Sequence, residues 1–120
     1  MKRIVVLISG SGSNLEAIIE SCAEKKINGR VVHVISNNPD AFGLTRASKF
    51  NIPSRIIDHK KFSSRIDFEN SLEEFLDTLS PDLIVLAGFM RILGTKITSK
   101  FSYKMINLHP SLLPMYPGLH

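Results

Sequence analysis

The chain has 120 residues, a length that suits one modest domain. Hydrophobic residues make up 43% and charged residues 22%, a balance typical of soluble globular proteins. The net charge of +4 is spread without a dense basic run, so we expect small anionic ligands and no nucleic-acid partner. No apolar run is long enough to cross a bilayer, so no membrane partner is expected. The single cysteine, Cys22, cannot form an internal disulfide, which favours a reducing compartment, the cytoplasm.

Strands and helices alternate along the chain. Residues 4–8 form a continuous apolar, β-branched run, typical of a strand buried on both faces. A helix follows, with apolar residues at helical spacing: Leu15, Ile18, Ile19 and Cys22. Further strands are predicted at 31–35, 53–57, 83–87 and 105–108, and further helices at 44–50 and 67–79. This order predicts one α/β domain over 1–120, with a doubly wound, Rossmann-like parallel sheet of strand order 3-2-1-4-5. Its ligands should lie beyond the carboxyl ends of strands 1 and 4.

The first loop, residues 9–14, is rich in glycine and serine. Glycines permit a tight turn, and the free N–H groups at a helix start suit a phosphate, so a side chain at Gly12 is expected to occupy the phosphate's approach. The alternative is a simple turn in which Ser13 or Asn14 caps the helix. Leu15 stands where a dinucleotide fingerprint has its third glycine, so a mononucleotide-sized phosphate ligand fits better than NAD.

Asn107 and His109 are two positions apart on the last predicted strand, so both side chains point to one face. They stand at the carboxyl end of the strand, on the ligand side. An asparagine amide can donate to a developing oxyanion, and a histidine can carry a proton. The spacing alone favours the alternative, a strand-end pair that caps loop carbonyls. No histidines have the spacing of metal ligands, so no metal site is predicted.

Three further features each have a structural interpretation, and the first also has a functional alternative. The apolar segment 86–93 is either a cover for the sheet end or a wall for a flat ring, with Arg91 near for a carboxylate, and composition leaves both open. His33 is expected to be a hydrogen-bonded strand histidine. The third long helix should present its acidic residues to solvent. These residues are Glu69, Glu73, Glu74 and Asp77.

Several motifs together resemble the glycinamide ribonucleotide formyltransferase family. Residues 8–15 resemble its phosphate loop, 36–41 its second-strand turn, and 86–93 its folate loop. The run Asn107-Leu108-His109-Pro110-Ser111-Leu112-Leu113-Pro114, continued by 116–120, resembles the formyltransferase signature. The motifs occur in the family's order and cover the whole chain.

The resemblance implies a transfer of formyl from 10-formyltetrahydrofolate to the amine of glycinamide ribonucleotide, a step of de novo purine biosynthesis. Backbone groups of Gly12, Ser13 and Asn14 would hold the ribonucleotide phosphate. The amine attacks the formyl carbon, Asn107 and a protonated His109 stabilise the tetrahedral oxyanion, and His109 gives a proton to the departing folate nitrogen. Contacts with the folate are implied for Arg65, Met90, Arg91, Ile92, Leu93 and Asn107.

Family members continue past residue 120, and their later part carries further strands and a catalytic aspartate that pairs with the histidine. The resemblance therefore implies a formyltransferase fold truncated at its C-terminal side. We expect weak or absent activity of 1–120 alone, and self-association through the uncovered edge of 105–108. Two alternatives remain. One is another folate-dependent formyltransferase such as the methionyl-tRNA enzyme, although residues 12–14 favour a small phosphorylated substrate. The other is a non-catalytic phosphate-binding fragment.

Overall fold

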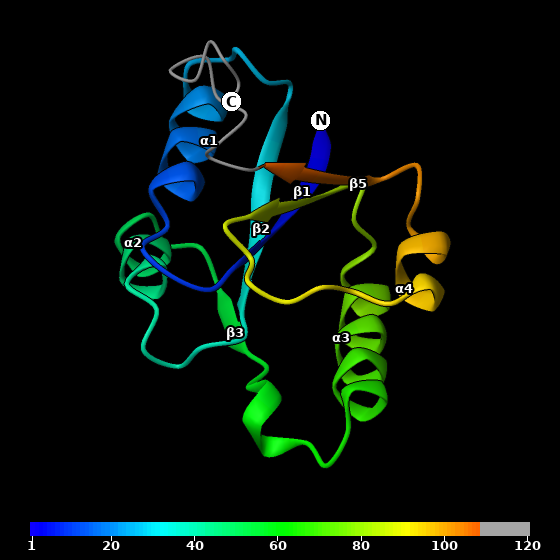
Figure 1. The fold of residues 1–120 in the computed structure, drawn as a ribbon. Coiled ribbons are helices and arrows are strands. Elements are labelled where there is room, and N and C mark those ends of the chain that lie inside the picture. Colours follow the sequence, from blue (N-terminus) through cyan, green and yellow to red (C-terminus); the bar gives the residue numbers. More distant parts are fainter. Residues whose placement is uncertain (109–120) are drawn as a thin grey trace, which may run out of the picture.

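A parallel sheet forms the centre of the protein in the computed structural model, which describes residues 1–108 (Figure 1). Its strands are β1 (Lys2–Ile8), β2 (Gly29–Ser36), β3 (Ser54–Ile56), β4 (Leu83–Ala87) and β5 (Met105–Leu108). The strand order is β3-β2-β1-β4-β5, and each neighbouring pair is parallel. The predicted doubly wound α/β fold and its strand order are confirmed.

Helices cover both faces of the sheet (Figure 1). They are α1 (Ser13–Ala23), α2 (Gly43–Lys49), α3 (Arg65–Leu79) and α4 (Thr95–Lys100), with a 3₁₀ turn at His59–Lys61. Helices α1 and α2 lie on one face, α3 and α4 on the other. The sequence did not predict α4, because a helix of only six residues has too few turns to show a periodic pattern. Within residues 1–108, no helix combines the length and apolar character needed to cross a membrane.

Strand β1 is buried on both of its faces, as its composition predicts. Ile4, Val6 and Ile8 pack toward α1 and α2. Val5 and Leu7 pack toward α3 and α4. All five side chains are at most 1% exposed. Burying each such side chain stabilises the fold by about 1.5–3 kcal/mol, so β1 anchors the two layers and holds the loop that follows it.

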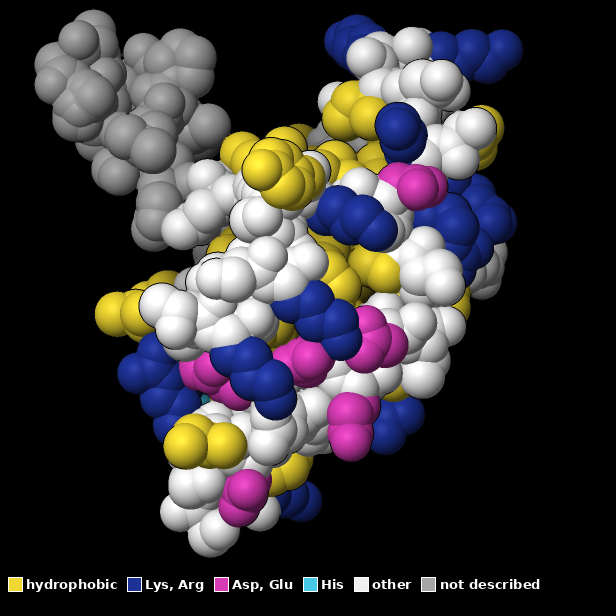
Figure 2. Space-filling view, turned by 90° about the vertical axis from the view of Figure 1, so that its right-hand side faces the viewer, with side chains coloured by type: hydrophobic (Ala, Val, Ile, Leu, Met, Phe, Trp, Pro, Cys, Tyr) yellow, Lys and Arg dark blue, Asp and Glu magenta, His cyan; other side chains and the backbone are white. Residues whose placement is uncertain are grey.

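The acidic side of α3 is only partly open to solvent, which corrects the expectation from its sequence. The side chains of Glu69 and Glu73 are 13% and 15% exposed. Helix α4 packs there, and Lys100 lies 2.9 Å from Glu73 and 2.6 Å from Asp77. Hydrogen bonds to Asp77 and Glu73 raise the pKa of the Lys100 ammonium. Figure 2 shows the resulting alternation of basic and acidic side chains on this side of the molecule.

His33 on β2 is not the hydrogen-bonded histidine that its sequence context suggested. Its Nε2 is buried and has no hydrogen-bond partner within the described residues. The ring stands edge-on to Phe75, with centroids 5.1 Å apart. Burial, and then the positive charge of Arg55, lower the pKa of His33. The neutral imidazole is therefore the form that the fold prefers.

Candidate active site

The carboxyl ends of β1, β4 and β5 lie side by side at one edge of the sheet. β1 and β4 are neighbours, with Leu7 opposite Leu86, and Leu86 is in turn opposite Asn107 of β5. The loop after β1 leads to α1 on one face of the sheet, and the segment after β4 leads to α4 on the other. This is the switch point of a doubly wound sheet, where ligands bind in such folds. The predicted switch point between β1 and β4 is therefore confirmed, and a ligand site beside it stays a prediction.

Gly12, and not Ser13 or Asn14, is the N-cap of α1. Its φ of 76° lies in the left-handed region, and no side chain caps the helix. Ser13 and Asn14 lie inside the first helical turn, which corrects the alternative in which one of them is the cap. The first N–H groups of a helix have no partner within the helix. Within residues 1–108, the N–H groups of residues 12–14 donate to no other protein group, so they remain available to an anion.

A small hollow of about 140 Å³ lies beside these N–H groups. Its lining joins the first loop to the end of β4, through Ala87 and Gly88. Gly88 also has a left-handed backbone, with φ of 71°, and turns the chain sharply away from the strand. Among the described residues, the hollow therefore combines backbone donors without a partner, a helix N-terminus and little side-chain bulk, the properties that favour a phosphate group.

Gly12 also lies against the start of α2. A β carbon added to Gly12 would stand 2.6 Å from the Cα of Gly43. A side chain at Gly12 would therefore collide with α2 before it could fill the phosphate's approach, which corrects the mechanism expected from the sequence. The backbone N–H of Gly43 donates to the Gly10 carbonyl at 3.0 Å, and this contact also holds the loop on α2.

A buried polar network joins the loops after β1, β2 and β4. The Met90 N–H donates to the Ser9 hydroxyl at 2.8 Å, and that hydroxyl donates to the side-chain oxygen of Asn37. The Asn37 amide in turn donates to Nδ1 of His59 at 3.3 Å. Ser9 is 7% exposed and Asn37 3% exposed. Neither Ser9 nor Asn37 was assigned a role of its own from the sequence, although polar side chains at the ends of adjacent parallel strands are a signal that groups the two residues.

The apolar segment after β4 divides its side chains between the core and the surface. Phe89 and Leu93 pack against the core on the α3 side of the sheet. Met90 and Ile92 are 79% and 84% exposed. Arg91 lies between them and is half-buried. The segment therefore covers the sheet end with one set of side chains and presents apolar side chains outward with the other.

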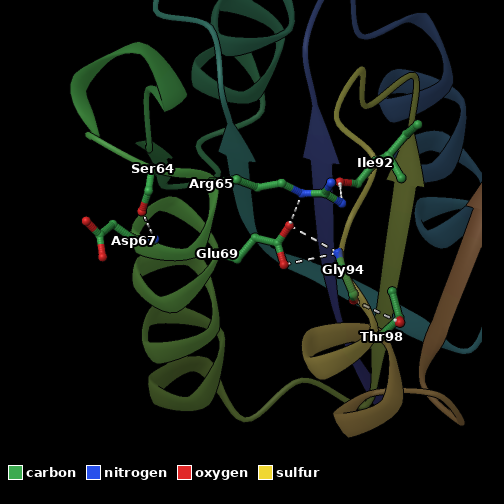
Figure 3. Close-up of polar contacts among 7 residues, drawn as sticks. All are labelled: Ser64, Arg65, Asp67, Glu69, Ile92, Gly94 and Thr98. Atoms are coloured by element: carbon green, nitrogen blue, oxygen red, sulfur yellow. Dashed lines mark hydrogen bonds and ion pairs between the residues drawn. The ribbon is translucent and has the colours of Figure 1, made fainter.

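Arg65, at the first position of α3, lies directly on this segment (Figure 3). Its Nη2 donates to the Ile92 carbonyl at 2.7 Å, and its Nε donates to Glu69 at 2.9 Å. Glu69 also accepts from the Gly94 N–H, at 3.0 and 3.1 Å to its two oxygens. The structure thus places Arg65 in contact with Ile92, within the set of residues that the family resemblance implies as folate contacts. The Arg65 side chain is still 53% exposed.

The predicted catalytic pair is only partly within the described residues. Asn107 lies near the carboxyl end of β5, and the residue is exposed. His109 lies outside residues 1–108, together with the rest of the signature at 110–120. Within the described part of the chain, no three His, Cys, Asp or Glu side chains gather into a group that could hold a metal ion.

The similarity of the chain to known proteins identifies its family. The profile described as "Formyl transferase" matches residues 2–120. The chain belongs to the formyl transferase family. It is 47% identical to phosphoribosylglycinamide formyltransferase of Haemophilus influenzae, over 100% of this chain and 57% of that protein. It is 50% identical to the Escherichia coli enzyme of the same name, over 98% of this chain and 55% of that protein.

A solved structure agrees with these relatives. The phosphoribosylglycinamide formyltransferase from Coxiella burnetii superposes with a TM-score of 0.87 at 53% identity, covering 96% of this chain and 54% of that one. The resemblance inferred from the sequence motifs is therefore confirmed. The chain spans about half the length of the curated relatives that it matches. It corresponds to their N-terminal part.

Proposed function

We propose that residues 1–120 form one domain, the phosphate-binding half and the start of the catalytic centre of a glycinamide ribonucleotide formyltransferase. One observation carries the proposal. In a chain of the formyl transferase family, the N–H groups of Gly12, Ser13 and Asn14, which have no partner within residues 1–108, border a hollow that also touches the end of β4. A phosphate bound there would direct the rest of a small phosphorylated substrate along the carboxyl edge, toward β4 and β5.

We propose 10-formyltetrahydrofolate as the formyl donor, bound along the segment after β4. The exposed apolar side chains of Met90 and Ile92 suit the flat ring system of this donor. The guanidinium groups of Arg65 and Arg91 suit the carboxylates of the same molecule. Leu93 supports this surface from the core side. The fit rests on the pairing of apolar side chains with one cationic group in the segment and another, Arg65, that contacts it from α3.

The proposed reaction uses Asn107 and His109. The amine of the substrate attacks the formyl carbon, and the Asn107 amide and a protonated His109 donate to the oxygen of the tetrahedral species. The bond between that carbon and the folate nitrogen then breaks, and His109 supplies the proton that the departing nitrogen takes. The new amide loses the proton that the attacking amine carried. We propose no metal in this step.

The remaining assignments follow from this activity. We propose small-molecule partners only, without nucleic acid, and a cytoplasmic location, where the free thiol of Cys22 stays reduced. The thiol is half-buried, and burial raises its pKa, which lowers its reactivity further.

A formyl-transfer assay tests the proposal. The protein made from the full reading frame is supplied with glycinamide ribonucleotide and 10-formyltetrahydrofolate, and the formylated product is measured. A parallel reaction contains methionyl-tRNA as acceptor. Transfer to glycinamide ribonucleotide alone supports the proposal. Transfer to methionyl-tRNA instead, or phosphate-ligand binding with no transfer to either acceptor, would contradict it.

A further inference from the structure

Arg46 of α2 reaches across to the phosphate loop and makes two short contacts there. Its Nε donates to the Ser11 carbonyl at 2.7 Å, and its Nη1 donates to the Glu16 carboxylate, also at 2.7 Å. The side chains of Arg46 and Glu16 are 27% and 22% exposed, so this ion pair is largely shielded from solvent. The guanidinium carbon also lies 5.0 Å from the centre of the Phe42 ring, which limits its freedom.

The contact with Ser11 sets the direction of a group that the phosphate would use. The Ser11 carbonyl and the Gly12 N–H belong to one trans peptide, and in a trans peptide these two groups point in opposite directions. When Arg46 holds the carbonyl on the α2 side, the Gly12 N–H must point away from α2. Arg46 therefore fixes a donor of the loop without occupying the place of the ligand.

The contact with Glu16 changes the charge at the start of α1. Glu16 lies in the first turn of that helix. A carboxylate suits the helix dipole there, but it repels a phosphate bound at the same end. The guanidinium of Arg46 cancels this negative charge at close range. Phosphate affinity should then depend on Arg46 even though the guanidinium is engaged by other groups.

We propose that Arg46 is the positioning residue of the phosphate loop, which orients the Gly12 N–H and neutralises Glu16 so that the loop accepts a phosphate monoester. The inference rests on the proposed function, and it adds a residue that acts through Ser11 and Glu16 and not by contact with the ligand.

The experiment compares variants of the protein made from its full reading frame. Calorimetry measures the dissociation constants of glycinamide ribonucleotide, of inorganic phosphate as a small probe, and of 10-formyltetrahydrofolate. Arg46→Met should weaken the binding of both phosphate ligands by about 10–100-fold, because the Gly12 N–H loses its fixed direction and the Glu16 carboxylate is no longer neutralised. The affinity for the folate should change less than about twofold, because the Arg46 contacts lie on the opposite side of the sheet from α3. Arg55→Met is the matched control, since Arg55 stacks on Phe75 at 4.4 Å, away from the loop.

A second variant separates the two effects of Arg46. In Arg46→Met/Glu16→Gln the repelling carboxylate is gone, so part of the lost phosphate affinity should return, by about 3–10-fold. Should Arg46→Met not fold, Arg46→Lys retains the charge and is expected to show an intermediate loss for phosphate ligands alone. Equal phosphate affinity in folded Arg46 variants and the unmodified protein overturns the inference. If the unmodified protein binds neither glycinamide ribonucleotide nor inorganic phosphate, the proposed function is overturned, and the inference with it.

Discussion

Gly12 and Gly43 are in direct backbone contact, with so little space that a β carbon on Gly12 would stand 2.6 Å from the Gly43 Cα. One glycine caps α1 and the other begins α2. The contact holds the end of the loop after β1 against a second helix. Its closeness depends on the absence of side chains on both partners.

Gly12→Ala should therefore destabilise the protein and weaken phosphate binding together. A left-handed φ of 76° costs an alanine about 1 kcal/mol, and the collision with α2 adds to this, so a loss of about 1–3 kcal/mol in unfolding free energy is expected. Gly10→Ala is the control, because a β carbon there meets nothing within 4 Å. Urea unfolding and calorimetry with glycinamide ribonucleotide compare the two. Equal unfolding midpoints for both variants would refute this account of the loop.

Glu69→Ala should loosen the segment after β4. Glu69 holds both Arg65 and the Gly94 N–H, and its side chain is only 13% exposed. Its loss should cost about 1–3 kcal/mol in unfolding free energy and weaken 10-formyltetrahydrofolate binding, while glycinamide ribonucleotide binding changes little. Glu74→Ala on the same helix is the control, since Glu74 is exposed and should change stability by less than about 0.5 kcal/mol. A folate affinity equal in the two variants would count against a supporting role for Glu69.

The sequence predicted the sheet well because buried parallel strands have a pattern of their own. The run at 4–8 is apolar on both faces, and the structure extends it only to Lys2. The site was predicted less completely, since its contacts join residues far apart in the chain. Arg46 and Ser11 are 35 positions apart, and no local pattern relates them. Likewise Phe89 and Met90 are equally apolar, and only the packing on α3 and α4 decides which one faces the core.

The pH dependence of stability should include a contribution from His33. Burial and the charge of Arg55 lower its folded-state pKa below the ordinary value of 6.5. The unfolded chain therefore binds the proton more tightly, and stability present above pH 6.5 is lost as the pH falls below it. His33→Phe keeps a ring beside Phe75 but cannot titrate. Its unfolding free energy should fall less than that of the unmodified protein between about pH 7.5 and about pH 5, and parallel pH profiles would contradict the assignment.

Asn107 and His109 should affect turnover far more than binding in an active, longer form of the protein. Asn107→Ala removes one proposed oxyanion donor and should lower turnover by about 10²–10³. His109→Ala removes the proposed acid and should lower it by about 10²–10⁴. Dissociation constants for both substrates should move much less, because the proposed interactions strengthen only in the transition state. Near-normal turnover in either variant would show that the role given to that residue is wrong.

The outer edge of β5 should make the 120-residue polypeptide associate with itself. Within residues 1–108, β5 pairs only with β4, and Ile106 on this strand is 48% exposed. The edge of a sheet with apolar neighbours is a template for another chain. Residues 1–120 made alone should therefore form oligomers or be marginally stable, with weak or absent formyl transfer. Ile106→Lys should reduce the association, because charge on an edge strand opposes pairing.

Sedimentation velocity at several concentrations, with a turnover assay beside it, compares this polypeptide with the protein made from its full reading frame. Tyr103→Lys is the control for Ile106→Lys, since Tyr103 is fully exposed in the turn before β5 and lies off the strand. A form of the protein as long as its relatives should show no association through this edge and should be active, because it has further residues available to cover β5. A monodisperse, heat-resistant and fully active 120-residue monomer would contradict the prediction. Oligomers that persist equally in Ile106→Lys and Tyr103→Lys would show that association occurs through a surface other than β5.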